Sequence, residues 1–150
     1  MAERLIAKKA INIHMGTSPY YRGSSCNFWA MHDGRPEMVG ATLHLLSKGL
    51  DSGAILFHAF PRAAAWDTFE LGTRAVAAAL EALVDQLREG AVFESPPLPQ
   101  DPSLEIRYTR NADFTDAVAG AYLEGLPTPE AIGQALQARP RDLTERAIFV

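Results

Sequence analysis

Short apolar runs, separated by glycine, serine and proline, mark the strands expected in the first 60 residues. AINIH, residues 10–14, is apolar and β-branched and ends before Gly16, which predicts a short strand. VGATLHLL at 39–46 and AILFHAF at 54–60 predict two more strands. The connection between these two is short and contains the loop GLDSG, so we expect a hairpin-like or adjacent pair rather than a helical crossover.

A long amphipathic helix is expected after residue 66. Asp67 followed by Glu70 is the pattern of a capping box, and Gly90 is the expected C-terminal stop. Between them one apolar stripe at helical spacing consists of Phe69, Val76, Leu80, Leu83 and Leu87.

Three shorter helices and one short strand complete the predicted elements. SCNFWAMHD can be capped by Ser24 or Ser25 and ended by Gly34. Residues 114–123 and 129–138 are helical by pattern, the latter with Thr128 as its N-cap, and IRYTR at 106–110 predicts a short edge strand. The elements together predict an α/β fold.

Composition and charge limit the function classes. The 150 residues are 47% hydrophobic and 21% charged, as expected of one globular domain with a core. A net charge of −4 and scattered basic residues argue against a nucleic-acid partner. The single cysteine, Cys26, allows no intrachain disulfide, and no signal-like or membrane-spanning apolar stretch is present, so a cytoplasmic location is the expectation.

Three polar residues stand at the ends of these strands. Asn12 and His14 lie two apart in the first strand and share a face, while Asp51 lies between two glycines in the loop before the third strand. An amide donor, an imidazole and a carboxylate together suit acyl transfer. The alternative from spacing alone is a structural role for all three, because polar residues at strand ends are common.

Three sequence blocks, in order, resemble the folate-dependent formyltransferase family. INIHMGTSPYYRG is similar to the Asn-x-His, Pro and Tyr-Arg-Gly loop of methionyl-tRNA, glycinamide ribonucleotide and nucleotide-sugar formyltransferases. FWAMHDG resembles the helix that follows, and VGATLHLLSKGLDSGAIL resembles the second signature with its Leu-Asp-x-Gly loop. The resemblance spans roughly residues 10 to 60 and implies a Rossmann-like sheet.

The resemblance implies a catalytic trio of Asn12, His14 and Asp51. In the implied reaction an amine receives the formyl group of 10-formyltetrahydrofolate, Asn12 and protonated His14 stabilise the oxyanion, and Asp51 supports His14. The Leu-Asp-x-Gly loop, here Leu50, Asp51, Ser52 and Gly53, is expected to form one wall of the folate pocket through its backbone.

Two further residues are candidate binding groups. His44 lies on the second strand and can reach the site, although a structural bond to backbone is an equal alternative. Arg22 can contact a substrate phosphate or carboxylate in a bidentate manner, or it can only brace its loop. His32 and His58 have no second ligand at metal spacing, so no metal is expected.

The family resemblance is partial and predicts an incomplete sheet. Relatives carry several strand and helix units before the Asn-x-His strand, whereas this sequence begins almost at that strand. We therefore divide the chain into a catalytic half over 1–112 and an accessory helical tail over 113–150. Parallel strands are usually covered on both faces, so an open edge at AINIH predicts a homo-oligomer or a partner chain.

The acidic charge favours an amine of a small molecule or nucleotide sugar as acceptor over a tRNA. Two alternatives remain at this stage. One is a formyltetrahydrofolate hydrolase, which uses water in place of the amine. The other is a non-catalytic folate-binding or partner-binding half-domain.

Overall fold

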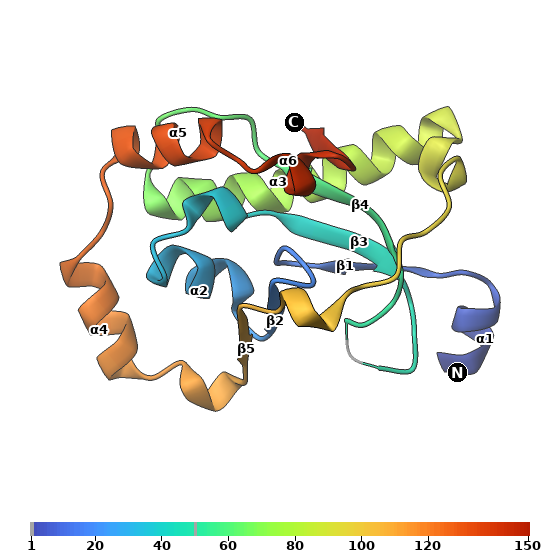
Figure 1. The fold of residues 1–150 in the computed structure, drawn as a ribbon, viewed down its shortest axis with the longest axis horizontal. Coiled ribbons are helices and arrows are strands. Elements are labelled where there is room, and N and C mark those ends of the chain that lie inside the picture. The colour runs from blue at the N-terminus through green and yellow to red at the C-terminus, as the bar shows by residue number, and fades with distance from the viewer. Residues whose placement is uncertain (1, 50) are drawn as a thin grey trace.

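A computed structural model describes residues 2–49 and 51–150. Figure 1 shows a small central sheet with the long helix α3 lying across it. The elements in chain order are α1 (Ala2–Ala7), β1 (Ile11–His14), β2 (Tyr21–Gly23), α2 (Cys26–His32), β3 (Ala41–Leu45), β4 (Ile55–Phe60), α3 (Thr68–Glu89), β5 (Arg107–Thr109), α4 (Asp116–Glu124), α5 (Pro129–Gln137), α6 (Arg141–Thr144) and β6 (Ala147–Phe149). The α/β class predicted from the sequence is confirmed.

The main sheet has the strand order β1-β3-β4-β6. β1 and β4 both pair antiparallel with β3, and only β6 runs parallel to its neighbour β4. The hairpin-like pairing of β3 with β4 is therefore confirmed, whereas the expectation of parallel strands is wrong for β1, β3 and β4. Antiparallel neighbours accept a short connection, and a parallel pair needs a dozen residues or more.

β1 lies at the edge of the main sheet, as predicted for AINIH. A second, two-stranded sheet pairs β2 with β5 in parallel, although Tyr21–Gly23 was expected to be loop. Gly23 has a φ of 92°, and a Cβ there would lie 1.9 Å from the backbone oxygen of Thr109. The second sheet thus depends on a glycine that lets two backbones approach closely.

The long helix α3 has the predicted ends but a different buried face. Asp67 accepts hydrogen bonds from the backbone N–H groups of Phe69 and Glu70, and Gly90 ends the helix at a φ of 73°. Glu70 binds Arg74, so its side chain does not complete the predicted capping box. The residues buried against the core are small, apart from one leucine: Leu71, Ala75, Ala78, Ala79 and Ala82.

Most of the predicted apolar stripe of α3 points away from the sheet, and only Leu83 packs partly against the apolar cluster of the sheet. Phe69, Val76, Leu80 and Leu87 are exposed, and Leu83 is half-buried. Alanines take the core face instead, because their small side chains allow the helix axis to approach the sheet closely.

The tail is held to the rest of the molecule by its own apolar residues. Ile132 and Leu136 of α5 and Leu143 of α6 are buried in the cluster that contains Tyr21 and Trp29. Residues 147–149 form strand β6 and extend the main sheet, where only helices were expected.

Within residues 2–49 and 51–150, no helix has the length and apolarity needed to cross a membrane.

Candidate functional site

Strands β1 and β3 bring four polar side chains to one face of the sheet. Asn12 pairs directly with His44, and His14 pairs with Thr42. Ile11 and Ile13 alternate with them and pack into the apolar cluster on the other face. The two-residue period of the strand thus places the polar side chains on one face of the sheet and the apolar side chains on the other.

The loop between β3 and β4 places Asp51 among these side chains. Its Oδ1 accepts a hydrogen bond from Asn12 Nδ2 at 3.0 Å, and its Oδ2 lies 3.3 Å from His14 Nδ1. His44 Nε2 lies 3.7 Å from the same Oδ1. Three residues predicted from two separate sequence blocks therefore meet in one cluster, with His44 as its fourth member.

Hydrogen-bond geometry fixes the tautomer of His44. Its Nδ1 lies 2.9 Å from the backbone oxygen of Leu45, which can only accept, so Nδ1 carries the proton. Its Nε2 then accepts from Asn12 Nδ2 at 3.0 Å. Both N–H groups of the Asn12 amide are consequently directed, one to His44 and one to Asp51.

Burial and a nearby carboxylate act in opposite directions on His14. The imidazole is 6% exposed, and this desolvation lowers the pKa of His14 below its usual 6.5, although the Asp51 carboxylate raises it in part. Because burial is the larger effect, His14 is mainly neutral at pH 7. Its Nε2 also lies 3.2 Å from the backbone oxygen of Tyr21, so each ring nitrogen faces an acceptor.

A residue missed by the sequence reasoning holds the loop of Asp51. The side-chain Nε2 of Gln100 donates to the backbone oxygens of Asp51 and Gly53, both at 2.8 Å. Gln100 follows a proline-rich segment, residues 96–99, with no pattern that points to the site. Only the fold brings it there.

Gly53 is needed where the loop returns to β4. A Cβ at this position would lie 1.6 Å from the backbone oxygen of Leu45 and 2.9 Å from His44 Nδ1. The loop and the imidazole it passes therefore meet at a separation that only glycine permits.

The other predicted binding residues lie in different surroundings. Ser52 is exposed and its Oγ is 3.0 Å from Ser47 Oγ, an internal bond of the loop. Arg22 forms an ion pair of 3.0 Å with Glu105, which braces the β2 loop. Leu50 lies outside the described residues.

The floor of the site is close-packed. A Cβ on Gly16 would lie 2.5 Å from Cys26 Cβ and 2.8 Å from His14 Nε2. Burial raises the pKa of the Cys26 thiol to about 12, with a smaller contribution from Asp51, so Cys26 is protonated and packs as an apolar group.

The cluster opens into a cavity of about 300 Å³ along the loop. Its lining residues are Asn12, His44, Leu46, Ser47, Lys48, Gly49 and Asp51. The volume lies at the lower end of the range for small-molecule sites, and polar groups converge on one end of it.

Comparisons with known proteins show the family of the chain. A family model described as formyl transferase matches residues 3–87. The methionyl-tRNA formyltransferase of Synechococcus sp. (strain JA-3-3Ab) is 36% identical over 94 residues, which cover 62% of this chain and 29% of that protein. The methionyl-tRNA formyltransferase of Anaeromyxobacter dehalogenans is 37% identical over 98 residues, covering 63% and 30%. The chain thus spans about 30% of the length of these curated relatives.

Solved structures show the same fold. A formyltransferase from Anoxybacillus kamchatkensis, crystallised with a UDP-linked formamido sugar and tetrahydrofolate, aligns with a TM-score of 0.54 at 24% identity over 90% of this chain and 67% of that chain. A 4-N formyltransferase from Francisella tularensis aligns with a TM-score of 0.59 at 21% identity, over 87% and 53%. The family model covers more than half of the 150 residues, and the chain therefore belongs to the formyltransferase family.

Proposed function

We propose that this chain carries the catalytic centre for formyl transfer from 10-formyltetrahydrofolate to an amine of a small molecule or nucleotide sugar. The observation that supports the proposal is the contact of Asp51 with both Asn12 and His14, at 3.0 and 3.3 Å, beside a cavity. An amide, a neutral imidazole and a carboxylate at these distances suit proton transfer and charge stabilisation at a carbonyl.

His14 is the proposed proton acceptor. The folate supplies an activated formyl group, and the attacking amine must lose a proton as it forms the new C–N bond. The lowered pKa of His14 keeps the ring neutral and able to accept that proton at pH 7. The amine proton reaches the ring through Asp51, which lines the cavity and lies 3.3 Å from His14 Nδ1; the protonated ring then donates to Asp51 from Nδ1 and to the Tyr21 carbonyl from Nε2. This order differs from the sequence hypothesis, in which His14 is protonated at the start.

Asn12 is the proposed donor to the formyl oxygen. Its two N–H groups point at His44 and Asp51, so one of them must be redirected when substrate binds. The bond to His44 holds the amide plane, and the bond to Asp51 is the one that the formyl oxygen replaces. His44 is then a positioning residue rather than a catalytic one.

The cavity has the size of one part of the formyl donor. At about 300 Å³ it accommodates a single ring system, not the whole folate with its glutamate tail. Asp51 and Gly49 line this space, and Gln100 fixes the loop through the backbone oxygens of Asp51 and Gly53, which suits a rigid wall for a flat heterocycle. Ser52 and Leu50 belong to the same proposed wall, and Arg22 stays a proposed contact for an anionic group of the acceptor.

The net charge of the chain supports the proposal of a small amine or nucleotide sugar as acceptor. The chain has a net charge of −4 and a pI near 5.5, whereas a tRNA-binding surface needs clustered basic residues. A small amine or nucleotide sugar needs no such surface. Formylation of initiator tRNA in preference to small amines would contradict this part of the proposal.

The first experiment measures binding and chemistry separately. We expect 5-formyltetrahydrofolate, a non-transferring relative of the donor, to raise the melting temperature of the 150-residue chain in a saturable way. Asp51→Asn is expected to abolish that rise, and Asp85→Asn, at an exposed carboxylate on α3, serves as the matched control. No rise at millimolar ligand would contradict a folate site in this chain.

The second measurement tests the assigned roles. With 10-formyltetrahydrofolate and a panel of amines, His14→Ala and Asp51→Asn are expected to reduce the formylation rate by roughly 10² or more. Unchanged rates in both variants would remove these residues from the mechanism. Release of free formate without an acceptor would instead indicate hydrolysis.

A further inference from the structure

α3 carries a second apolar face with the spacing of a coiled-coil seam. Steps of four and three residues alternate along it without interruption, through Phe69, Thr73, Val76, Leu80, Leu83 and Leu87. This is the heptad pattern of a helix that packs against another helix along its length. The pattern is separate from the sheet-facing side of α3, which contains the buried alanines.

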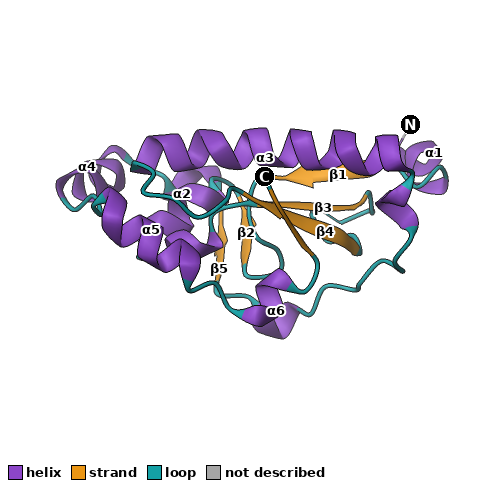
Figure 2. Ribbon diagram, turned by 90° about the horizontal axis from the view of Figure 1, so that it is seen from above, coloured by secondary structure: helices purple, strands orange, loops and turns teal. Residues whose placement is uncertain are grey.

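The second face of α3 is open to solvent. Phe69 is 65% exposed, and Leu80 and Leu87 are each 54% exposed. In Figure 2, α3 runs along one side of the molecule, and no described element covers it from outside. A helix that is apolar on two opposite sides has the character of a buried helix, so an unpaired seam of this length indicates an interaction surface.

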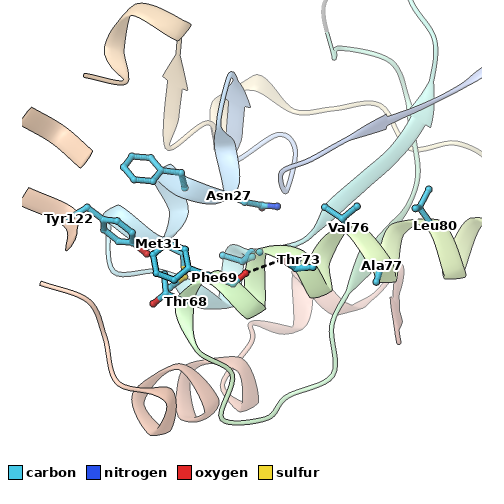
Figure 3. A pocket seen from close by; sticks show the side chains of 12 residues that line it. Asn27, Met31, Thr68, Phe69, Thr73, Val76, Ala77, Leu80 and Tyr122 are labelled. Atoms are coloured by element: carbon cyan, nitrogen blue, oxygen red, sulfur yellow. Dashed lines mark hydrogen bonds between the residues drawn. The ribbon is translucent and has the colours of Figure 1, made fainter. Parts of the chain in front are cut away.

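An apolar groove continues from the seam toward α2 and α4. Figure 3 shows Val76 and Leu80 on the α3 side of this groove, with Asn27 and Tyr122 farther along it. Its volume is about 650 Å³, and its lining also includes Phe28, Met31 and Phe69. The groove lies apart from the polar cluster of Asn12, His14 and Asp51, so the seam and the groove form a surface distinct from the proposed active site.

We propose that this face is the interface of a homodimer in which α3 packs antiparallel against α3 of a second copy. The two-fold axis lies on the seam side of α3, at the level of residue 78 along the helix. The proposal does not rest on the proposed formyl transfer, and it uses a face other than the edge strand β1.

The antiparallel register closes without an unmatched layer. With the axis at the level of residue 78, Val76 of each copy lies opposite Leu80 of the other, Thr73 lies opposite Leu83, and Phe69 lies opposite Leu87. The inner layers therefore pair a β-branched residue with a leucine, and each outer layer pairs the aromatic ring with a leucine. Such alternation of shapes is what close packing between two helices requires.

Charges beside the seam favour the antiparallel direction over the parallel one. In the antiparallel pair, Glu70 of one copy lies within about one turn of Arg88 of the other, on the same side of the seam. In a parallel pair the two-fold axis would place the two copies of Glu70 on opposite sides of the seam, and Glu70 and Arg88 of different copies would lie far apart along the helices. Complementary charges thus set the direction, while the apolar layers supply the stability.

The area is sufficient for a reversible dimer. The exposed parts of the seam side chains amount to on the order of 500 Å² per copy, and charged and small neighbours add to this toward the roughly 800 Å² per partner of a standard interface. We therefore expect association in the micromolar range and not a permanent dimer.

The test measures the mass of the 150-residue chain over a range of concentrations by sedimentation velocity. We expect a shift from monomer to dimer between about 1 and 100 μM, which Leu80→Glu weakens at least tenfold. Leu123→Glu is the matched control, because Leu123 on α4 is also about half exposed, at 55%, but lies outside the seam. A wild-type chain that stays monomeric at 100 μM, or equal effects of both variants, would overturn the proposal.

Crosslinking tests the direction and register. Cys26 is buried and protonated, so it does not compete with introduced cysteines in disulfide formation. An equimolar mixture of Val76→Cys and Leu80→Cys chains is expected to give disulfide-linked dimers at least fivefold faster than either variant alone. Faster crosslinking of Leu80→Cys with itself would indicate a parallel pair and overturn the register.

Discussion

Asn12 and His44 are direct cross-strand partners whose side chains meet at 3.0 Å, with the amide donating to the imidazole. The Leu45 carbonyl fixes the ring as the Nδ1–H tautomer, so the orientation of Asn12 depends on a histidine that itself has no proton to give at Nε2. This relationship links the backbone of β3 to an amide in the proposed catalytic cluster.

We predict that His44→Ala lowers the turnover of formyl transfer on the order of 10- to 100-fold, because the Asn12 amide loses the acceptor that orients it. His44→Gln places an amide oxygen near the same point and is expected to restore a large part of the rate. The measurement is kcat together with the KM for the amine in both variants.

A purely structural role for His44 would give a different result. Both variants would then lose melting temperature and activity together, and Gln would restore neither. The tautomer can be read independently from the ¹⁵N shifts of the His44 ring, where a protonated Nε2 would contradict the assignment.

Gln100→Ala is expected to weaken binding of 5-formyltetrahydrofolate by about tenfold. Its side chain makes two hydrogen bonds to the loop of Asp51, and each bond contributes roughly 1 kcal/mol to the order of that loop. Calorimetric titration measures the change. Gln134→Ala, at an exposed position on α5, is the control and should leave the dissociation constant unchanged.

Gly53→Ala and Gly120→Ala are expected to have opposite effects on stability. A methyl group at Gly53 meets the Leu45 carbonyl and the His44 ring, so the loop must shift and both folding and formyl transfer should suffer. At Gly120, within α4, no atom lies within 4 Å of the added Cβ. There the substitution is expected to stabilise by about 0.5–1 kcal/mol through helix propensity. Chemical denaturation of the two variants compares them directly.

Because His58 is buried, we expect the fold to lose stability as the pH falls below 6.5. It is buried on β4, and desolvation lowers the pKa of His58 from 6.5 to about 4. The unfolded chain binds a proton at this residue below pH 6.5, while the folded chain does not until about pH 4. Its contribution is therefore complete above pH 6.5 and is lost as the pH falls to about 4, an effect of up to about 3 kcal/mol.

Urea denaturation at pH 7 and pH 4 measures this contribution. His58→Leu removes the titrating group and the hydrogen bond that Nδ1 donates to Thr42 Oγ1. The variant is expected to be less stable at pH 7 but to lose less stability on acidification than the wild type. An equal loss in both proteins would show that other groups control the acid limit.

The strands and the polar cluster of Asn12, His14 and Asp51 were predictable because local signals define them. Glycine and proline mark the ends of β1, β3 and β4, and the two-residue period of a strand places Asn12 and His14 on one face. The position of Asp51 beside them follows from the short β3–β4 connection. Gln100 could not be found in this way, because a residue from a segment without a motif reaches the site only through tertiary folding.

The buried side of α3 was not predictable from its large apolar residues. A search for bulky side chains identifies Phe69, Val76 and Leu80, whereas the core side of this helix is made of alanines. Alanine gives a weak hydrophobic signal and a strong packing advantage where a helix lies close on a sheet. The sequence therefore shows one stripe of large apolar residues, although the folded helix has a second apolar face made mainly of alanines.

The backbone conformation of Asp51 determines which substitutions are informative. With a φ of 48° it lies in the left-handed region, where asparagine and aspartate are tolerated far better than alanine or branched residues. Replacement by alanine changes the charge and strains the turn together, so a defect in that variant has two causes. Asparagine keeps the shape of the side chain and the local conformation, so any rate it loses reports the negative charge and the one acceptor oxygen that becomes an N–H₂ donor.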